Sequence, residues 1–134
     1  MSFIPAISVN AKAIYIAQQS DPTNQRYVFS YTITINNSSE LNYQLLSRHW
    51  LIQDANQKIE EVYGEGVIGE QPIIKSGESY TYTSGAILET DMGTMEGKYF
   101  MVQATENDTE KNHQQNTFEV SVPKFLLSVP RVLH

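Results

Sequence analysis

The chain has 134 residues, no cysteine and a formal net charge of −6. This length suits one domain spanning residues 1–134, which would bury about two-thirds of its unfolded surface. The absence of cysteine from the sequence excludes a disulfide framework, a thiolate metal site and a cysteine nucleophile. An acidic chain without a basic cluster also makes a poor binder of nucleic acid, because displacing counterions from phosphates requires concentrated Lys and Arg.

The N-terminal residues Met1–Pro5 lack the basic and apolar pattern of a secretory signal. No stretch approaches the roughly 20 apolar residues that a membrane-spanning helix requires. These features predict a cytoplasmic protein that does not insert into membranes.

Alternating apolar and polar residues predict about seven short strands. The clearest lies at 26–36, where Tyr27, Phe29, Tyr31, Ile33 and Ile35 share one face. No convincing amphipathic helix accompanies them, so the fold class is all-β, an immunoglobulin-like sandwich of antiparallel strands. The polar stretch 106–116 predicts an exposed hairpin or loop. The expected strands cover residues 7–17, 26–36, 43–53, 57–62, 79–84, 98–105 and 117–122.

Two aromatic residues are expected to matter for the core. Trp50, the single tryptophan, falls on the third expected strand, where a large aromatic side chain commonly fills the centre of such a sandwich. Tyr99 begins the sixth strand. It could form a tyrosine corner by hydrogen bonding to nearby backbone, or it could pack its ring at the sheet surface.

Four segments resemble the bacterial ApaG family: RHWLIQDAN at 48–56, EVYGEGVIGEQP at 61–72, YTYTSG at 80–85 and MEGKY at 95–99. The resemblance runs through most of the chain in this order. It implies a fibronectin type III-like sandwich and an association with cobalt and magnesium efflux, in which this chain would not itself be a transporter. A similar domain at the C-terminal end of certain eukaryotic F-box proteins points to partner recognition.

The glycines Gly64, Gly66 and Gly69 match the dinucleotide-binding pattern G-x-G-x-x-G. That chemistry needs a helix N-terminus directing backbone N–H groups at a pyrophosphate. Here Pro72 follows the glycines, and Glu65 and Glu70 would repel an anion. The sequence therefore favours a turn-rich loop with positive φ angles over a phosphate site.

Acidic residues near this loop are the other candidate ligands. Their oxygens could contact a divalent cation such as magnesium, although no metal-binding motif spaces them, and a solvated acidic rim explains them as well. The histidines His49, His113 and His134 are too dispersed for a zinc site. No cofactor is therefore expected. The acidic residues concerned are Asp54, Glu60, Glu61, Glu65 and Glu70.

Strand alternation suggests a surface for a partner. If Trp50 points inward, Leu45, His49 and Leu51 share the outward face of the third strand, where two leucines are unusual for a solvated sheet. Alternatively, the N-terminal segment 3–7 covers them. The neighbouring sixth strand would extend this face with one of two sets, and the sequence does not choose between them. The sets are Phe100, Val102 and Ala104, or Tyr99, Met101 and Gln103.

The sequence contains no pairing of a nucleophile with a base, so we expect no enzyme. We expect instead a protein-interaction module whose partner is unidentified and whose exposed sheet face could also form an oligomer. The alternative is a small-ligand module that binds a nucleotide, pyrophosphate or divalent metal at Gly64–Gly69. The predicted partner surface comprises Arg48, His49, Leu51, Asp54, Glu65, Glu70 and Gln71.

Overall fold

The computed structural model describes residues 6–104 and 117–130, which are built almost entirely from β-strands. Two short 3₁₀ turns, η1 (Ala17–Gln19) and η2 (Pro22–Asn24), lie between the first two strands. The strands are β1 (Ile7–Tyr15), β2 (Tyr27–Asn37), β3 (Asn42–Asp54), β4 (Ile59–Glu65), β5 (Ile73–Ile74), β6 (Ser79–Leu88), β7 (Met92–Ala104) and β8 (Phe118–Ser128).

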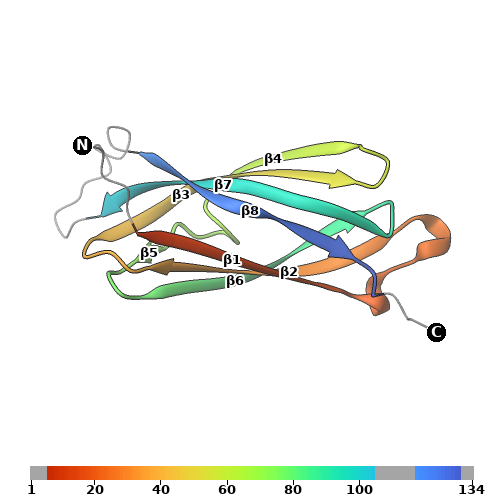
Figure 1. The fold of residues 1–134 in the computed structure, drawn as a ribbon, viewed down its shortest axis with the longest axis horizontal. Helices are drawn as coiled ribbons and strands as arrows, with labels where there is room; N and C mark the ends of the chain where they lie inside the picture. The colour runs from red at the N-terminus through yellow and green to blue at the C-terminus, as the bar shows by residue number, and fades with distance from the viewer. Residues whose placement is uncertain (1–5, 105–116, 131–134) are drawn as a thin grey trace.

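The strands form two antiparallel sheets that pack face to face (Figure 1). One sheet has the order β1-β2-β6; the other has the order β4-β3-β7-β8, with β5 pairing to β3. On one side of the sandwich β1 lies against β8. On the other side β4 and β6 are edge strands of different sheets. The expected all-β sandwich is confirmed.

The alternation predicted for β2 is present in the structure. Phe29, Tyr31, Ile33 and Ile35 are buried and belong to one hydrophobic cluster shared by both sheets. The intervening threonines face outward and form hydrogen bonds with threonines of β6, Thr32 with Thr83 (2.9 Å) and Thr34 with Thr81 (3.1 Å). The period of two therefore separates a buried face from a hydrogen-bonded polar face.

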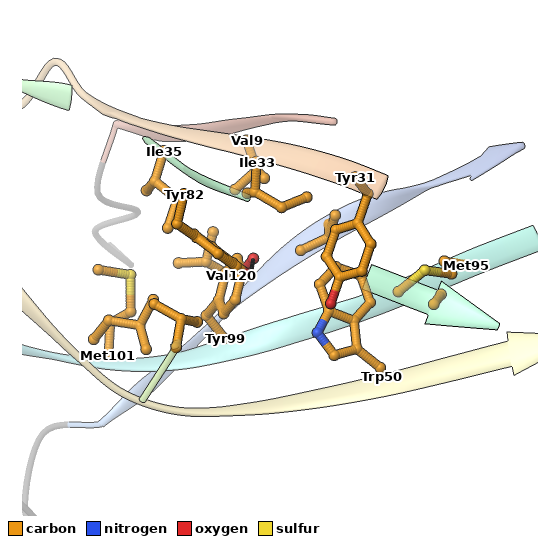
Figure 2. Packing of buried hydrophobic residues seen from close by; sticks show 14 of the residues in the cluster. Val9, Tyr31, Ile33, Ile35, Trp50, Tyr82, Met95, Tyr99, Met101 and Val120 are labelled. Atoms are coloured by element: carbon orange, nitrogen blue, oxygen red, sulfur yellow. Dashed lines mark hydrogen bonds between the residues drawn. The ribbon is translucent and has the colours of Figure 1, made fainter. Parts of the chain in front are cut away.

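Trp50 is the centre of the core, as predicted, with 2% of its surface exposed. Its ring makes edge contacts with Tyr31 (centroids 5.7 Å apart), Phe125 (6.0 Å) and Tyr99 (6.1 Å). Figure 2 shows Trp50 reaching from one sheet toward Tyr31 on the other. These contacts tie β3 to β2, β7 and β8 at a single side chain.

The prediction that Leu45 faces outward with Leu51 is wrong. Leu45 is fully buried in the core. The register between β3 and β7 shifts between Leu45 and Ser47, so Leu46 is an extra residue on β3. A bulge of this kind reverses which alternate residues face the core. Leu45 and Trp50 therefore both point inward, although one has an odd and the other an even residue number.

Tyr99 does not form a backbone-bonded tyrosine corner, and its ring does not lie at the surface. Tyr99 is fully buried, and its hydroxyl forms a 2.6 Å hydrogen bond with the hydroxyl of Tyr82. Met101 is also in the core, so β7 turns Phe100, Val102 and Ala104 to the other face. Phe100 is half-buried there, while Val102 and Ala104 are buried.

Several strand ends also differ from the predictions. Gly64, expected in the loop, belongs to β4, and β7 begins at Met92, six residues before the strand expected at 98–105. The short β5 was not predicted. β6 continues through Gly85, and β8 continues through Pro123. Proline is tolerated there because β8 is an edge strand. Some expectations fall outside the described residues. These concern residues 3–5 of the segment expected to cover Leu45 and Leu51, the loop at 106–116, and the histidines His113 and His134.

Candidate binding groove

A groove follows the side of the sandwich where β4 and β6 are unpaired edges. It consists of three adjoining hollows, all of which include Ile52 in their lining. Val62 of β4 and the backbone of Gly85 in β6 line two of them, and the half-exposed Ile87 continues the apolar wall. The groove therefore lies between two strand edges, each with backbone groups that face no neighbouring strand.

Arg48 lies at one end of this groove, on the inner side of β3. Its Nη1 atom donates hydrogen bonds to the carbonyl oxygens of Gly66 (2.8 Å) and Glu65 (3.2 Å). The side chain is half-buried and forms no ion pair with any carboxylate of the described residues. Arg48 is thus a cation whose charge is not neutralised, although two carbonyl oxygens hold it in place.

The indole nitrogen of Trp50 is a second donor at this end. It is buried and has no hydrogen-bond partner within the described part of the chain, and Trp50 lines the same hollow as Arg48. Tyr31 and Ser84, opposite each other on β2 and β6, contribute side chains with hydroxyl groups. The hollow has a volume of about 260 Å³, which is room for a small polar group with part of its chain.

The tyrosine pair beneath Arg48 remains protonated. Burial raises the pKa of the Tyr82 hydroxyl well above its usual value of 10.0, and burial raises that of Tyr99 further. Arg48 opposes both increases because its positive charge favours the ionised phenol. At neutral pH these hydroxyls are therefore neutral hydrogen-bonding groups, and they supply no negative charge to pair with Arg48.

The glycine loop forms a tight turn beside Arg48. Gly66 and Gly69 have positive φ angles of 62° and 80°, as the sequence predicts, whereas Gly64 does not. Val67 and Glu70 exchange backbone hydrogen bonds of 2.8 and 2.9 Å, and the amide of Gly66 donates to Leu46. These three N–H groups are already bonded, and no helix follows them, so the loop lacks the open cradle of a dinucleotide site.

The far end of the groove has the opposite character. It is lined by Asp54, Lys58, Glu60 and Glu89. Lys58 pairs with Glu89 (Nζ to Oε1, 3.1 Å), and the Asp54 carboxylate accepts the backbone N–H groups of Asn56 and Lys58 in the β3–β4 turn. Three carboxylates and one ammonium group leave this end with net negative charge.

The structure does not gather the predicted partner surface into one place. His49 and Leu51 face outward, where His49 stacks on Tyr63 with the rings 4.0 Å apart. Arg48 is on the opposite face of the same strand, so its placement on the His49 face is wrong. Asp54 and Glu65 lie at opposite ends of the β3–β4 hairpin.

The other two predicted loop residues contact neighbouring elements. Glu70 accepts a 3.3 Å hydrogen bond from the Tyr80 hydroxyl of β6, and the side-chain amide of Gln71 donates to the carbonyl of Leu46 (2.9 Å). Glu70 therefore links the loop to the second sheet at the mouth of the groove. It does not border the outward face of His49 and Leu51.

The carboxylates proposed as metal ligands do not converge. Within residues 6–104 and 117–130, no three His, Cys, Asp or Glu side chains are close enough to share a metal ion. The same residues contain no helix with the length and apolar character needed to cross a membrane.

Sequence reasoning missed most of the groove. Its apolar wall, Ile52, Val62 and Ile87, looks like ordinary strand residues, and Trp50 reads as core filler. Only knowledge that β4 and β6 are both unpaired edges on one side brings these residues together. No local pattern carries that information, because the two strands belong to different sheets and different parts of the chain.

Together, the two packed sheets and the groove between their unpaired edges define an antiparallel β-sandwich domain with a candidate binding groove along one side. The ApaG domain family matches residues 17–103. Protein ApaG of Photobacterium profundum is 52% identical over 130 residues, 97% of this chain and 95% of that protein. Protein ApaG of Thiobacillus denitrificans is 47% identical over 128 residues, 96% of this chain and 94% of that protein.

Solved structures agree with the sequence relatives. A crystal structure of the ApaA protein from Bordetella pertussis superimposes with a TM-score of 0.84 at 41% identity, covering 96% of this chain and 97% of that one. The chain belongs to the ApaG family.

Proposed function

We propose that this chain is a non-enzymatic protein-interaction module that holds an extended segment of a partner protein between β4 and β6. The observation that carries the proposal is that two unpaired strand edges, β4 and β6, lie on the same side of the sandwich with an apolar wall between them. An added strand can hydrogen-bond to such an edge while its side chains occupy the groove. Any association with cobalt and magnesium efflux would then act through the partner.

The outer face of the larger sheet supports this role less well. Its apolar residues Leu51 and Tyr63 are interrupted by charged pairs, Lys98 with Glu119 (3.4 Å) and Lys124 with Glu96 (3.6 Å). Such pairs are typical of a solvated face. The alternative of a nucleotide or metal site at Gly64–Gly69 is less well supported still, because the amides of Gly66, Val67 and Glu70 are bonded and the nearby described carboxylates are scattered.

The test uses a displayed library of linear decapeptides as the probe. Ser84 faces the groove opposite Tyr31, so Ser84→Phe should fill the hollow that Ser84→Ala leaves open. Peptides selected on the parent should bind Ser84→Phe at least about tenfold more weakly and bind Ser84→Ala unchanged. Leu51→Lys, on the outer face, should also leave binding unchanged.

Two results would overturn the proposal. One is that no linear peptide is selected. The other is that the selected peptides lose affinity for Leu51→Lys and keep it for Ser84→Phe, which would place the site on the outer face. Thermal melts establish that each variant is folded. If Ser84→Phe fails to fold, Ile87→Glu at the exposed rim of the groove takes its place.

A further inference from the structure

The end of the groove at Arg48 has a cation without an anionic partner and an N–H donor without an acceptor among the described residues. Arg48 has no carboxylate partner among the described residues, and its hydrogen bonds go to two backbone carbonyls through Nη1. The indole N–H of Trp50 has no partner in residues 6–104 and 117–130, although only 2% of that residue is exposed. Both side chains line the same hollow.

Native proteins seldom leave such groups unmatched. A buried N–H without an acceptor is unfavourable, and a partly buried cation is usually paired with an anion. Two such donors from alternate residues of β3 share one hollow, so a single negatively charged acceptor could satisfy both. Because no described side chain supplies this acceptor, it would come from the molecule that occupies the groove.

We propose that this end of the groove binds a carboxylate group of the partner segment, held by the guanidinium of Arg48 and the indole N–H of Trp50. This inference rests on the proposed function and adds the chemistry that the site selects. The carboxylate belongs to an Asp or Glu side chain or to the C-terminal residue of the segment.

The surroundings favour a carboxylate over a phosphate. A phosphate group carries more charge, and it is usually bound by several cations or by free backbone N–H groups. Of the described residues that line this hollow, Arg48 is the single cation, and the nearby amides of Gly66, Val67 and Glu70 are already bonded. One planar guanidinium with one further donor matches the two oxygens of a carboxylate.

The charge distribution along the groove also fixes where the acid binds. The opposite end contains Asp54, Glu60 and Glu89 with a single lysine, Lys58. An acidic group would be repelled there and attracted to Arg48. The groove thus orients a bound segment so that its acidic group is next to the glycine loop.

The test observes Trp50 directly. Because Trp50 is the single tryptophan, a ¹⁵N-labelled sample gives one indole N–H signal. The probes are a groove-binding decapeptide selected from the library, the same peptide with each Asp and Glu changed to Asn and Gln, and both forms with an amidated C-terminus. Acetate, acetamide and inorganic phosphate serve as minimal probes.

The carboxylate-bearing peptide should shift the indole signal and bind at least about tenfold more tightly than the fully neutral form. If the groove binds an acidic side chain of the peptide, amidation of the peptide C-terminus should have little effect. If the groove binds the C-terminal carboxylate, amidation alone should remove the preference for the acidic peptide. Acetate should move the indole signal more than acetamide or phosphate does.

Variants of Arg48 separate binding from support of the loop. Arg48→Gln should reduce the preference for the acidic peptide over the neutral one to less than about twofold, and Arg48→Lys should keep part of it. Lys12→Gln, which removes an exposed cation of β1 outside the groove, is the matched control and should preserve the preference. A purely structural Arg48 would weaken both peptides equally and leave the ratio unchanged.

Equal binding of the acidic and neutral peptides by the parent, or an unmoved indole signal, would overturn this inference while leaving the groove as a peptide site. A stronger indole shift with phosphate than with acetate would overturn the choice of a carboxylate. Failure of every peptide to bind would instead refute the proposed function.

Discussion

The two long sides of the sandwich are built differently. On the side where β1 meets β8, Val9, Val120 and Val122 are buried, and no Lys or Arg of the described residues lines the hollow along the seam. On the side where β4 faces β6, the lining includes Arg48 and the unpartnered Trp50 nitrogen. Among the described residues, the seam between β1 and β8 is lined without a cationic side chain, whereas the side between β4 and β6 has a cation and an unpartnered indole N–H.

This difference shows how one strand can serve both the core and a site. β3 places Leu45 and Trp50 in the interior, and the same inner face carries Arg48 and Ile52 to the groove. The Trp50 ring packs in the core, and the same side chain, whose buried nitrogen has no partner among the described residues, also lines the hollow. The filled interior therefore holds the donors of the open side in fixed positions.

Replacing Trp50 should have the largest effect on the filled interior. Trp50→Ala removes the side chain that joins four strands, and the free energy of unfolding should fall by about 3 to 5 kcal/mol. Urea denaturation measures this, with Tyr63→Ala on the outer face as the control, because Tyr63 is 67% exposed and should change stability by less than about 1 kcal/mol. Comparable losses for the two variants would mean that the core is wrongly placed.

The hydroxyl pair of Tyr82 and Tyr99 should make the protein sensitive to alkali. Both pKa values are raised by burial, so above pH 10 the unfolded state loses protons that the native state retains. Stability should then fall by about 1.4 kcal/mol per pH unit for each tyrosine. Below pH 10 this contribution is fully present.

Urea denaturation of Tyr82→Phe, Tyr99→Phe and the double variant separates these contributions. Each single variant leaves one buried hydroxyl without its partner and should lose about 1 to 3 kcal/mol at pH 7, whereas the double variant should lose less than the sum. The double variant should also be less sensitive above pH 10. Additive losses would contradict the hydrogen-bonded pair.

Alanine substitutions in the glycine loop, at the mouth of the groove, should reduce stability by a smaller amount. A methyl group at Gly66, whose φ is 62°, would collide with the carbonyl oxygen of Glu70, so Gly66→Ala should destabilise by about 2 to 3 kcal/mol. Gly69 also has a positive φ but open space around it, and Gly69→Ala should lose about 1 kcal/mol. Thermal melts compare the two, and the reverse order would contradict the turn geometry.

Substitutions of Leu51 on the outer face should have the smallest effect. Leu51 is half-buried and lies opposite Glu61 and Glu96 on its two neighbouring strands. Leu51→Glu places like charges side by side and should lose up to about 1 kcal/mol, whereas Leu51→Lys should change stability by about 0.5 kcal/mol or less. Chemical denaturation checks both. Unfolding of the lysine variant would show that Leu51 belongs to the core.

The sequence was sufficient for those parts of the fold that depend on local alternation. The repeat in β2 and the inward position of Trp50 follow from a period of two within one strand. The bulge at Leu46 could not be predicted in the same way, because it depends on how β3 aligns with β7. Strand alternation therefore predicts the wrong orientation for Leu45, although it predicts the right one for Trp50, five residues later.

The candidate site was less predictable than the fold. The glycine loop and Arg48 were both recognised, but Arg48 was placed on the wrong face of the sheet. The contact of Arg48 with the loop carbonyls depends on β4 returning beside β3, and the groove depends on β6 from the other sheet. Such contacts join distant segments, so they follow from the order of strands and not from spacing along the chain.

The most direct test of the groove is to locate a bound peptide by nuclear Overhauser effects. With a decapeptide selected on the parent, contacts from peptide protons should reach the Trp50 indole N–H, Val62 of β4 and Ile87 of β6. Contacts to His49, Leu51 and Tyr63, with none to the Trp50 indole, would place the partner on the outer face and contradict a binding groove between β4 and β6.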